Sequence, residues 1–320
     1  MAKYKVLETD YAWPDTEIER NILAEVDAEL IVAEQTDVAS LAALAADCDA
    51  IMTNWAQVPE AVIAAAVNCR IVARLGIGLD NIDVDYCTRN GIVVTNIPDY
   101  CLIEVAEHAL AQMLSLARKV AFYHHQTQSG VYDLKAGGKM YRVEGQTLGV
   151  IGFGNIGRKL AEKALGIGLR VVAASKSRRN PLEGVEWVDR AALFEQSDFV
   201  SLHLPAVPET HHLVGPEQLA SMKPTAFLIN TARGSLVDHE ALAAELARGG
   251  IAGAALDVQD PEPPDLSVPP YNDPRVIVTP HAAFVSEESL ADLRRRTAQQ
   301  VADRLEGRTP ESVVNPDVLN

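Results

Sequence analysis

The chain has 320 residues, of which 48% are hydrophobic, and it carries a formal net charge of −16. This length and composition are typical of a packed protein of about two domains, which excludes extensive disorder. The charge argues against nucleic acid or an anionic membrane as a partner, because either polyanion would be repelled.

Short apolar runs alternate with segments of helical period in the first part of the chain. The strand-like runs lie at residues 3–8, 29–35, 50–55 and 70–76, and the helical segments at 16–26, 38–48 and 59–68. Such alternation predicts βαβ units and a parallel sheet with helices on both faces. The pattern stops near Pro98, which closes a last strand-like segment.

Residues 101–128 run for about 28 residues without Gly or Pro and predict one long helix. After a stretch that contains glycines, the alternation restarts at residue 147. Its strand-like runs lie at residues 147–151, 170–175, 198–204, 226–232, 252–258 and 276–280. A final helical segment, residues 286–307, is compatible with packing on either half. The sequence therefore predicts two α/β domains.

The segment GVIGFGNIG places Gly152, Gly154 and Gly157 between a strand pattern and a helical one. In this GxGxxG spacing the first glycine allows a tight turn and the second lets the backbone approach a pyrophosphate. The third lets the helix pack on the strand, with its N-terminal amides facing the anion. The alternative is a glycine-rich turn without a ligand, which the βαβ context disfavours. The segment predicts a dinucleotide site.

The loop VVAASKSRRN, residues 171–180, lacks the carboxylate that usually binds the ribose 2′-hydroxyl of NAD. Ser175 occupies that place and is followed by Lys176, Arg178 and Arg179. A serine followed by cations can bind a 2′-phosphate through charge-assisted hydrogen bonds, whereas a carboxylate would repel it. The loop therefore favours NADP(H), with NAD(H) possible; the alternative is a solvent-exposed run of charge.

Three further motifs follow strand patterns: NTARG with Arg233, LDVQDPEP with Asp257 and Glu262, and TPHAAF with His281. Each alone has a structural explanation, as a surface ion pair, a solvated carboxylate or a packed histidine. In this order, and with the glycine motif and RLGIGLDNID, they resemble the D-isomer-specific 2-hydroxyacid dehydrogenases over nearly the whole chain. NTARGSLVD, GAALDV and TPHAAFVSEESL are most similar to the C-terminal-binding-protein-like branch.

The resemblance implies an α/β fold of two doubly wound parallel-sheet domains. A flavodoxin-like substrate domain, residues 1–98 and 286–320, would contain an inserted Rossmann cofactor domain, residues 99–285. The final helix would then return to the substrate domain. Residues 101–145 correspond to the family's dimer contact, so we expect a homodimer.

The resemblance also implies a catalytic trio. Arg233 would clamp the substrate carboxylate and α-oxygen, a task that suits a planar guanidinium. His281 would be the general acid and base at the carbonyl oxygen. Glu262 would hydrogen-bond His281, fix its tautomer and favour its protonated form. The leading hypothesis is thus an NAD(P)H-dependent reductase of a small 2-keto acid that forms the D-2-hydroxy acid.

The remaining contacts implied by the resemblance divide between cofactor and substrate. The cofactor would contact Gly152, Gly154, Asn155, Ile156, Gly157, Ser175, Lys176, Arg178, Arg179, Leu204, Pro205, Thr210, Thr231, Ala232, Arg233, Asp257, His281 and Ala283. The substrate would contact Asn54, Trp55, Ile77, Gly78, Tyr100, Arg233, His281 and Phe284, with backbone amides at Ile77 and Gly78 binding its carboxylate.

Departures from the family pattern narrow the hypothesis. Ser175 replaces the Asp of NAD-using members, as in NADP-preferring glyoxylate and hydroxypyruvate reductases. Glu262 stands where formate dehydrogenases of this superfamily have Gln, which argues against formate. Phe284 stands where the animal C-terminal-binding proteins have Trp, so their substrate preference does not carry over.

Two other functions stay open. The animal C-terminal-binding proteins are dinucleotide-sensing scaffolds for partner peptides and keep the same trio. Residues 263–267, PPDLS, are similar to the peptides that such scaffolds bind, and we interpret this short match as chance. Some family members oxidise phosphite with the same trio, so an unusual donor of that kind is also allowed.

The four cysteines, Cys48, Cys69, Cys87 and Cys101, are widely spaced without a CxxC pair. They indicate neither a zinc site nor a disulfide framework. The N-terminal residues lack the apolar core of a signal peptide, and no apolar run reaches the roughly 18 residues that span a bilayer. We therefore expect a cytoplasmic enzyme without a metal.

Overall fold

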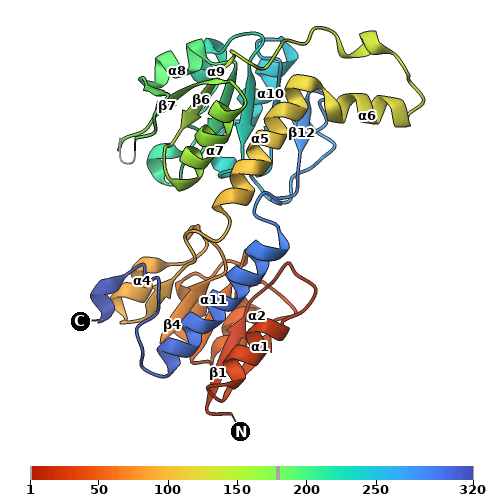
Figure 1. Ribbon diagram of the computed structural model, residues 1–320. Coiled ribbons are helices and arrows are strands. Elements are labelled where there is room, and N and C mark those ends of the chain that lie inside the picture. The colour runs from red at the N-terminus through yellow and green to blue at the C-terminus, as the bar shows by residue number, and fades with distance from the viewer. Residues whose placement is uncertain (1, 178–180, 320) are drawn as a thin grey trace. The chain divides into compact units, whose positions relative to one another are not determined.

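The computed structural model describes residues 2–177 and 181–319. The chain divides into two compact units (Figure 1). Unit 1 comprises Met1–Tyr100 and Ser286–Asn320, and unit 2 comprises Cys101–Val285. Each unit contains a parallel sheet with helices on both faces, so the predicted fold class is confirmed. No helix of the described residues is long and apolar enough to cross a membrane.

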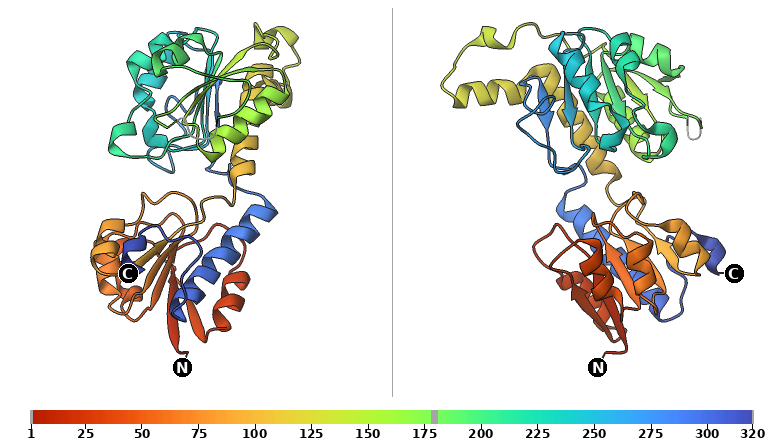
Figure 2. Two further views of the ribbon diagram at one scale, coloured as in Figure 1. Left: turned by 60° about the vertical axis from the view of Figure 1, so that its left-hand side comes forward. Right: turned by 180° about the vertical axis from the view of Figure 1, so that it is seen from behind.

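Unit 1 contains, within its described residues, a five-stranded parallel sheet in the order β2-β1-β3-β4-β5, which is the flavodoxin-like order. The strands are β1 (Tyr4–Glu8), β2 (Ala28–Val32), β3 (Ala50–Thr53), β4 (Ile71–Arg74) and β5 (Val93–Thr95). Helices α1 (Glu17–Ala24) and α11 (Glu287–Leu305) pack on one face (Figure 2). On the other face lie α2 (Val38–Ala45), α3 (Glu60–Ala65) and α4 (Val84–Arg89).

Helix α11 is anchored on α1 by a buried ion pair. The Arg294 guanidinium donates from Nε to Glu19 Oε1 and from Nη2 to Asp15 Oδ1, both at 2.8 Å. Ser286 caps the helix by accepting a hydrogen bond from the backbone N of Ser289 at 2.9 Å. The final helix, which sequence periodicity alone left unassigned, therefore packs in unit 1.

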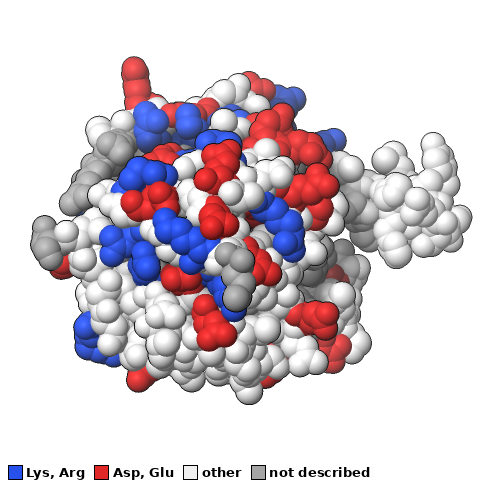
Figure 3. All heavy atoms as spheres, turned by 90° about the horizontal axis from the view of Figure 1, so that it is seen from below, with Lys and Arg blue, Asp and Glu red and all other residues white. Residues whose placement is uncertain are grey.

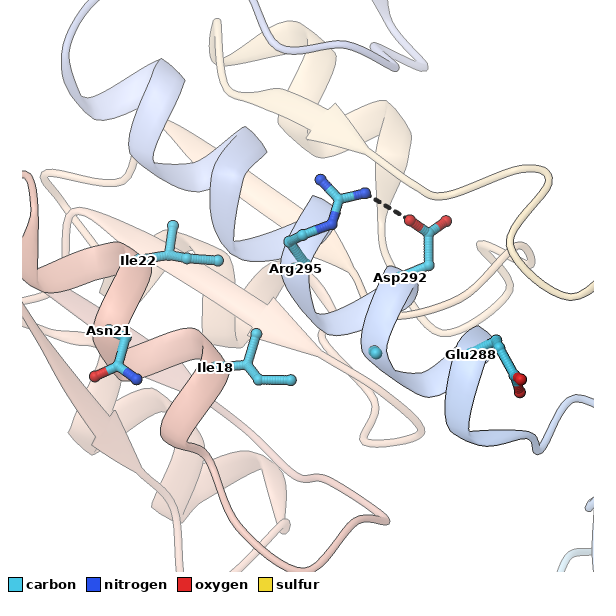
Figure 4. A pocket seen from close by; sticks show the side chains of 7 residues that line it. Ile18, Asn21, Ile22, Glu288, Asp292 and Arg295 are labelled. Atoms are coloured by element: carbon cyan, nitrogen blue, oxygen red, sulfur yellow. Dashed lines mark hydrogen bonds and ion pairs between the residues drawn. The ribbon is translucent and has the colours of Figure 1, made fainter.

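A surface groove lies beside this anchor, between α1 and α11 (Figure 4). Its apolar lining comes from Ile18, Ile22 and Ala291. At its edge Arg295 and Asp292 pair with each other at 2.6 Å. The groove is thus the solvent-exposed margin of the α1–α11 contact.

Glu8, at the carboxyl end of β1, is a buried carboxyl group. Its exposed fraction is 0%, and neither oxygen has a hydrogen-bond partner among the described residues. Nearby Arg294 is already shared by Glu19 and Asp15. Burial, followed by repulsion from Glu19, raises the pKa of Glu8 to about 8. Glu8 therefore holds its proton at neutral pH.

We predict that ionisation of Glu8 weakens folding as the pH rises. An unfolded glutamate titrates near pH 4.3, so between that pH and about 8 the folded state holds a proton that the unfolded state has released. Glu8→Gln keeps the shape of the side chain and needs no proton. It should raise the melting temperature by roughly 5 °C at pH 9 and change it little at pH 5.

The matched control is Glu29→Gln, on the exposed face of β2. It should leave the melting temperature of the protein unchanged at both pH values, as followed by circular dichroism. If Glu8→Gln shifted the melting temperature equally at pH 5 and pH 9, the neutral state assigned to Glu8 would be wrong.

Unit 2 contains, over its described residues, a seven-stranded parallel sheet in the order β12-β11-β10-β9-β6-β7-β8. Six of these strands, in the order β8-β7-β6-β9-β10-β11, follow the Rossmann order, and β12 is one further strand at the edge beside β11. The order reverses between β6 and β9, so the loops after β6, β9 and β10 lie at the edge where ligands bind. The strands are β6 (Thr147–Ile151), β7 (Arg170–Ala174), β8 (Val185–Trp187), β9 (Phe199–Leu202), β10 (Phe227–Asn230), β11 (Gly253–Leu256) and β12 (Val276–Val278).

The helices of unit 2 cover both faces of this sheet (Figure 2). One face packs against α5 (Leu102–Arg118) and α7 (Asn155–Gly166). The other packs against α8 (Arg190–Gln196), α9 (Pro216–Ser221) and α10 (His239–Ala247). Short 3-10 turns are η1 (Leu134–Gly137), η2 (Pro208–Thr210) and η3 (Gly234–Leu236) in unit 2, and η4 (Pro316–Leu319) in unit 1.

The prediction of one long helix over residues 101–128 is wrong. The chain forms α5 and then α6 (Val120–Gln128), separated by Lys119 in the left-handed conformation with φ 53°. Helix α5 packs an apolar face on the sheet, whereas α6 has no buried residue. The composition of residues 101–128 favours a helix throughout, although contact with the core ends at Ala117. After Lys119, α6 runs in a different direction from α5 (Figure 1).

Candidate active site

The glycine loop turns sharply between β6 and α7. Gly152 has φ +90°, and a Cβ there would lie 2.1 Å from a carbonyl oxygen of the loop after β9. A Cβ on Gly157 would lie 2.3 Å from the carbonyl oxygen of Gly152, whereas one on Gly154 would meet no atom within 4 Å. No side chain caps α7, whose first amides belong to residues 155–156. Close packing at two glycines and open space at the third fit a pyrophosphate on the helix N-terminus.

The loop after β7 begins next to these glycines. The backbone N of Gly152 donates to the carbonyl oxygen of Ala174 at 2.9 Å. Ser175 follows directly and is partly exposed, and Lys176 is exposed. Arg178 and Arg179 lie outside the described residues. Ser175 thus lies at the carboxyl end of β7, the place where proteins of this fold bind the 2′-position of the ribose.

The loop after β9 is closed by its own hydrogen bonds. The Thr210 hydroxyl accepts from the backbone N of Val207 at 3.0 Å and lies 2.7 Å from the carbonyl oxygen of Pro205. The Leu204 side chain would lie 2.8 Å from a Cβ on Gly152. Leu204 therefore adjoins the glycine loop, while the hydroxyl of Thr210 is used within its own loop. Cofactor contact by Thr210 stays a prediction.

Asn230 shapes the turn that carries Arg233. Its fully buried amide donates to the carbonyl oxygen of Arg233 at 2.8 Å and accepts from the backbone N of Ala232 at 3.1 Å. The Thr231 hydroxyl is buried and has no hydrogen-bond partner among the described residues. Sequence reasoning missed Asn230, although it opens the NTARG motif. The turn presents Arg233 and an unpartnered hydroxyl at the carboxyl end of β10.

The Asp257 carboxylate holds the loop that carries His281. Asp257 is fully buried, directly after β11. Its Oδ1 accepts from the Thr279 hydroxyl at 2.5 Å and from the backbone N of Ala282 at 2.9 Å. Its Oδ2 accepts from the backbone N of Ala283 at 2.9 Å. The protein itself thus uses both oxygens, so cofactor contacts by Asp257 and Ala283 stay predictions.

Two side chains of helix α5 contact the loop that carries His281. His108 Nε2 lies 3.1 Å from the Thr279 hydroxyl and 3.4 Å from Asp257 Oδ1. Gln112 Nε2 donates to the same hydroxyl at 3.0 Å. Sequence reasoning missed both residues because their segment was interpreted as a dimer contact alone. Their spacing of four, on the helix face that buries Ala109, is the signal that indicates an inward-facing pair.

The structure brings His281 and Glu262 together. His281 Nδ1 lies 2.9 Å from Glu262 Oε2, and Glu262 Oε1 accepts from the backbone N of Gln259 at 2.8 Å. The two side chains are 25% and 33% exposed, so small molecules can reach them. His281 has φ 52°, a strained conformation that clusters at functional sites. The Phe284 ring lies edge-on to the His281 imidazole, and the two ring centroids are 6.2 Å apart.

Two of the predicted substrate residues lie at the end of β3 in unit 1. The backbone N of Asn54 donates to Asp10 Oδ1 at 3.1 Å, and that of Trp55 to Asp10 Oδ2 at 2.7 Å. Asn54 is 3% exposed, whereas Trp55 is 41% exposed. Asp10, which follows β1, thus fixes this loop and was not predicted.

The other unit 1 candidates follow β4 and β5. Arg74 Nε donates to the carbonyl oxygen of Gly78 at 2.9 Å, and Asn96 donates to that of Ile77 at 2.8 Å. Tyr100 is half-buried against the α1–α11 side of the core. These hydrogen bonds involve the carbonyl oxygens of Ile77 and Gly78, not the backbone amides that we expect to bind the substrate carboxylate. Substrate binding by Ile77, Gly78 and Tyr100 stays a prediction.

Comparisons with known proteins agree with this geometry. Residues 110–283 match the family model described as "D-isomer specific 2-hydroxyacid dehydrogenase, NAD binding domain". A glyoxylate reductase of Korarchaeum cryptofilum is 41% identical over 286 residues, which cover 85% of this chain and 84% of the relative. A hydroxypyruvate reductase of Thermotoga maritima is 35% identical over 308 residues, covering 95% and 98%.

A crystal structure of a protein from Thermus thermophilus has the same fold, with a TM-score of 0.90 at 31% identity, over 97% of this chain and 99% of that one. The likeness therefore extends over both units, and the residues that match the family model include Gly152, Arg233 and His281. The chain belongs to the D-isomer-specific 2-hydroxyacid dehydrogenase family.

Proposed function

We propose that this protein reduces a small 2-keto acid to the D-2-hydroxy acid with NADPH. The observation that carries the proposal is the His281–Glu262 pair, joined at 2.9 Å. It lies in the unit whose sheet also carries the glycine loop and the Arg233 turn at its carboxyl edge. The names of the glyoxylate and hydroxypyruvate reductases among its relatives support this substrate class.

The residues present fit a nicotinamide dinucleotide. Open space at Gly154 and the uncapped start of α7 would hold the pyrophosphate. The unpartnered Thr231 hydroxyl would bind towards the nicotinamide end. When bound, the cofactor supplies the hydride that the carbonyl carbon accepts.

The chain's own residues then handle charge and protons. Arg233 binds the substrate carboxylate and polarises the carbonyl through a planar fork of N–H donors. Because His281 Nδ1 faces Glu262, Nε2 is the atom that gives its proton to the carbonyl oxygen as negative charge develops there. In the reverse direction neutral Nε2 takes the hydroxyl proton. Asp257 keeps the imidazole at its position throughout.

We predict that the purified protein oxidises NADPH in the presence of glyoxylate or hydroxypyruvate. His281→Gln should lower kcat by about 10²- to 10⁴-fold, because the general acid is lost. Arg233→Gln should raise the KM for the keto acid and also lower kcat, because Arg233 both binds the carboxylate and polarises the carbonyl. The control is His211→Gln, an exposed histidine outside the site, which should behave as wild type in the same spectrophotometric assay.

The proposal fails if the wild-type protein oxidises neither cofactor with any of a broad set of acids. That set comprises glyoxylate, hydroxypyruvate, pyruvate, and longer and aromatic 2-keto acids. It also fails if His281→Gln and His211→Gln retain equal kcat values.

The preference for NADPH is proposed on the charge of the loop after β7. Ser175→Asp should lower kcat/KM for NADPH by about tenfold or more, since a carboxylate would repel the 2′-phosphate, and should improve NADH in comparison. Arg178→Ala should raise the KM for NADPH more than that for NADH. A wild-type protein that already prefers NADH would contradict the proposal, and the loop would then be a surface turn.

A homodimer is proposed through the arm formed by α6 and residues 129–145. Residues 120–132 contain no Lys, Arg, Asp or Glu, and the lobe at the right of Figure 3 is correspondingly white. Within the arm Tyr132 is 95% exposed and Leu134 is 82% exposed. Apolar side chains gathered on a segment with so little burial indicate a protein contact.

We predict that the double variant Tyr132→Asp, Leu134→Asp sediments as a monomer of 34.6 kDa, whereas the wild type sediments at twice that mass. Burying two carboxylates in an apolar contact would cost more than the contact provides. Val67→Asp, at an equally exposed position of unit 1, is the control and should stay dimeric. A wild-type monomer at micromolar concentration would contradict this assembly.

A further inference from the structure

The Thr279 hydroxyl, two residues before His281, lies at the centre of a cluster of hydrogen bonds. Its oxygen lies 2.5 Å from Asp257 Oδ1, 3.0 Å from Gln112 Nε2 and 3.1 Å from His108 Nε2. A hydroxyl group has one proton to donate and two lone pairs that accept. Three partners therefore use the whole hydrogen-bonding capacity of this side chain.

The proton of the hydroxyl goes to Asp257. A separation of 2.5 Å is typical of a hydroxyl that donates to a charged carboxylate. The backbone N atoms of Ala282 and Ala283 donate to the same carboxylate, which therefore acts only as an acceptor. Both lone pairs of the hydroxyl are left to accept, so the two α5 side chains must donate to it. His108 thus carries a proton on Nε2, and Gln112 presents Nε2 rather than Oε1.

The other amide atom of Gln112 agrees with this assignment. Gln112 is 4% exposed, and its Oε1 has no hydrogen-bond partner among the described residues. A buried carbonyl oxygen without a partner destabilises the fold. Turning the amide over would place Oε1 against a hydroxyl whose only proton is already used by Asp257. An apolar side chain would avoid the unpartnered oxygen, so stability alone does not explain a glutamine here.

These hydrogen bonds hold the chain on both sides of His281. The Thr279 hydroxyl binds the Asp257 carboxylate before His281, and the backbone N atoms of Ala282 and Ala283 bind it after His281. His281 itself has φ 52°, a conformation that persists only when its surroundings impose it. A Thr279 hydroxyl that has lost a donor is free to rotate away from Asp257. The constraint before His281 would then weaken.

We propose that His108 and Gln112 are positioning residues, which hold the Thr279 hydroxyl on Asp257 and thereby keep the His281 imidazole in place for proton transfer. Both act through Thr279 on the backbone of the His281 loop. The effect on turnover rests on the proposed function. The proton on His108 Nε2 and the hold on the loop do not depend on it.

The kinetic test removes one donor at a time and compares kcat with KM. His108→Leu and Gln112→Met should each lower kcat for keto acid reduction about fivefold, because one hydrogen bond to Thr279 is lost. The KM for the keto acid should change little, since Arg233 lies on a separate turn after β10. His108→Gln, which again offers an N–H donor, should restore most of kcat. The control is Glu107→Leu, at an exposed position of the same helix, which should behave as wild type.

A double-mutant cycle identifies the shared partner. Thr279→Val removes the hydroxyl and keeps the shape of the side chain. In that background Gln112→Met should have almost no further effect on kcat, because the group that it positions is gone. Additive losses in the cycle would overturn the inference, as would a KM for the keto acid that rises as much as kcat falls.

Two measurements without substrate keep this inference separate from the proposed function. In protein labelled with ¹⁵N-histidine, the His108 signals are assigned by their loss in His108→Leu and should show a protonated Nε2. Hydrogen exchange, followed by mass spectrometry, should be faster in His108→Leu for the peptide of residues 280–285 and unchanged elsewhere in unit 2.

These two results decide the positioning even if no keto acid is reduced and the proposed function fails. An unprotonated His108 Nε2 would refute it, as would equal exchange of residues 280–285 in the wild type and the variant. Faster exchange throughout unit 2 would show a general loss of stability and would also refute it.

Discussion

The buried carboxylate of Asp257 is the constraint on which the arrangement of this site depends. A charge removed from water is costly unless hydrogen bonds replace its hydration. Here the loop after β12 supplies them, from Thr279, Ala282 and Ala283. Satisfying the carboxylate requires the loop to fold back, and His281, between these donors, takes up the left-handed conformation as a result. Because β10, β11 and β12 are hydrogen-bonded neighbours, the turns after them lie at one edge of the sheet.

Much of the fold follows from local rules that the sequence displays. Strands buried on both faces appear in the sequence as apolar runs. In the loop after β6, Gly152 and Gly157 are required by contacts that leave no room for a Cβ. The helix over residues 101–128 was mispredicted because its composition carries no stop signal at Lys119. Helix α5 ends there because its contact with the core ends, and that contact depends on tertiary structure. The three-residue edge strand β8 is too short for its period to be read from the sequence.

The site was less predictable from residues alone. Spacing predicted the glycine motif, and the family resemblance predicted the roles of Glu262 and His281, which are 19 residues apart. The residues that hold the loops of the candidate site in place were not predicted, because they act through hydrogen bonds that only the folded chain forms. These are Asp10, which holds the loop after β3, Asn230, which shapes the Arg233 turn, and the α5 pair His108 and Gln112, which contacts the His281 loop. Apart from the spacing of four between His108 and Gln112, they follow no pattern in the sequence, so only the folded chain reveals which loop each one holds.

The most direct measurement of the central claim is the transfer of deuterium from the cofactor to the product. The protein would be given hydroxypyruvate and NADPH deuterated at both C4 positions, and the product would be examined by NMR and chiral chromatography. Hydride transfer with protonation of the carbonyl oxygen predicts the D-hydroxy acid with one deuterium at C2 for each NADPH consumed. A product of L configuration, or a product without deuterium at C2, would contradict the account.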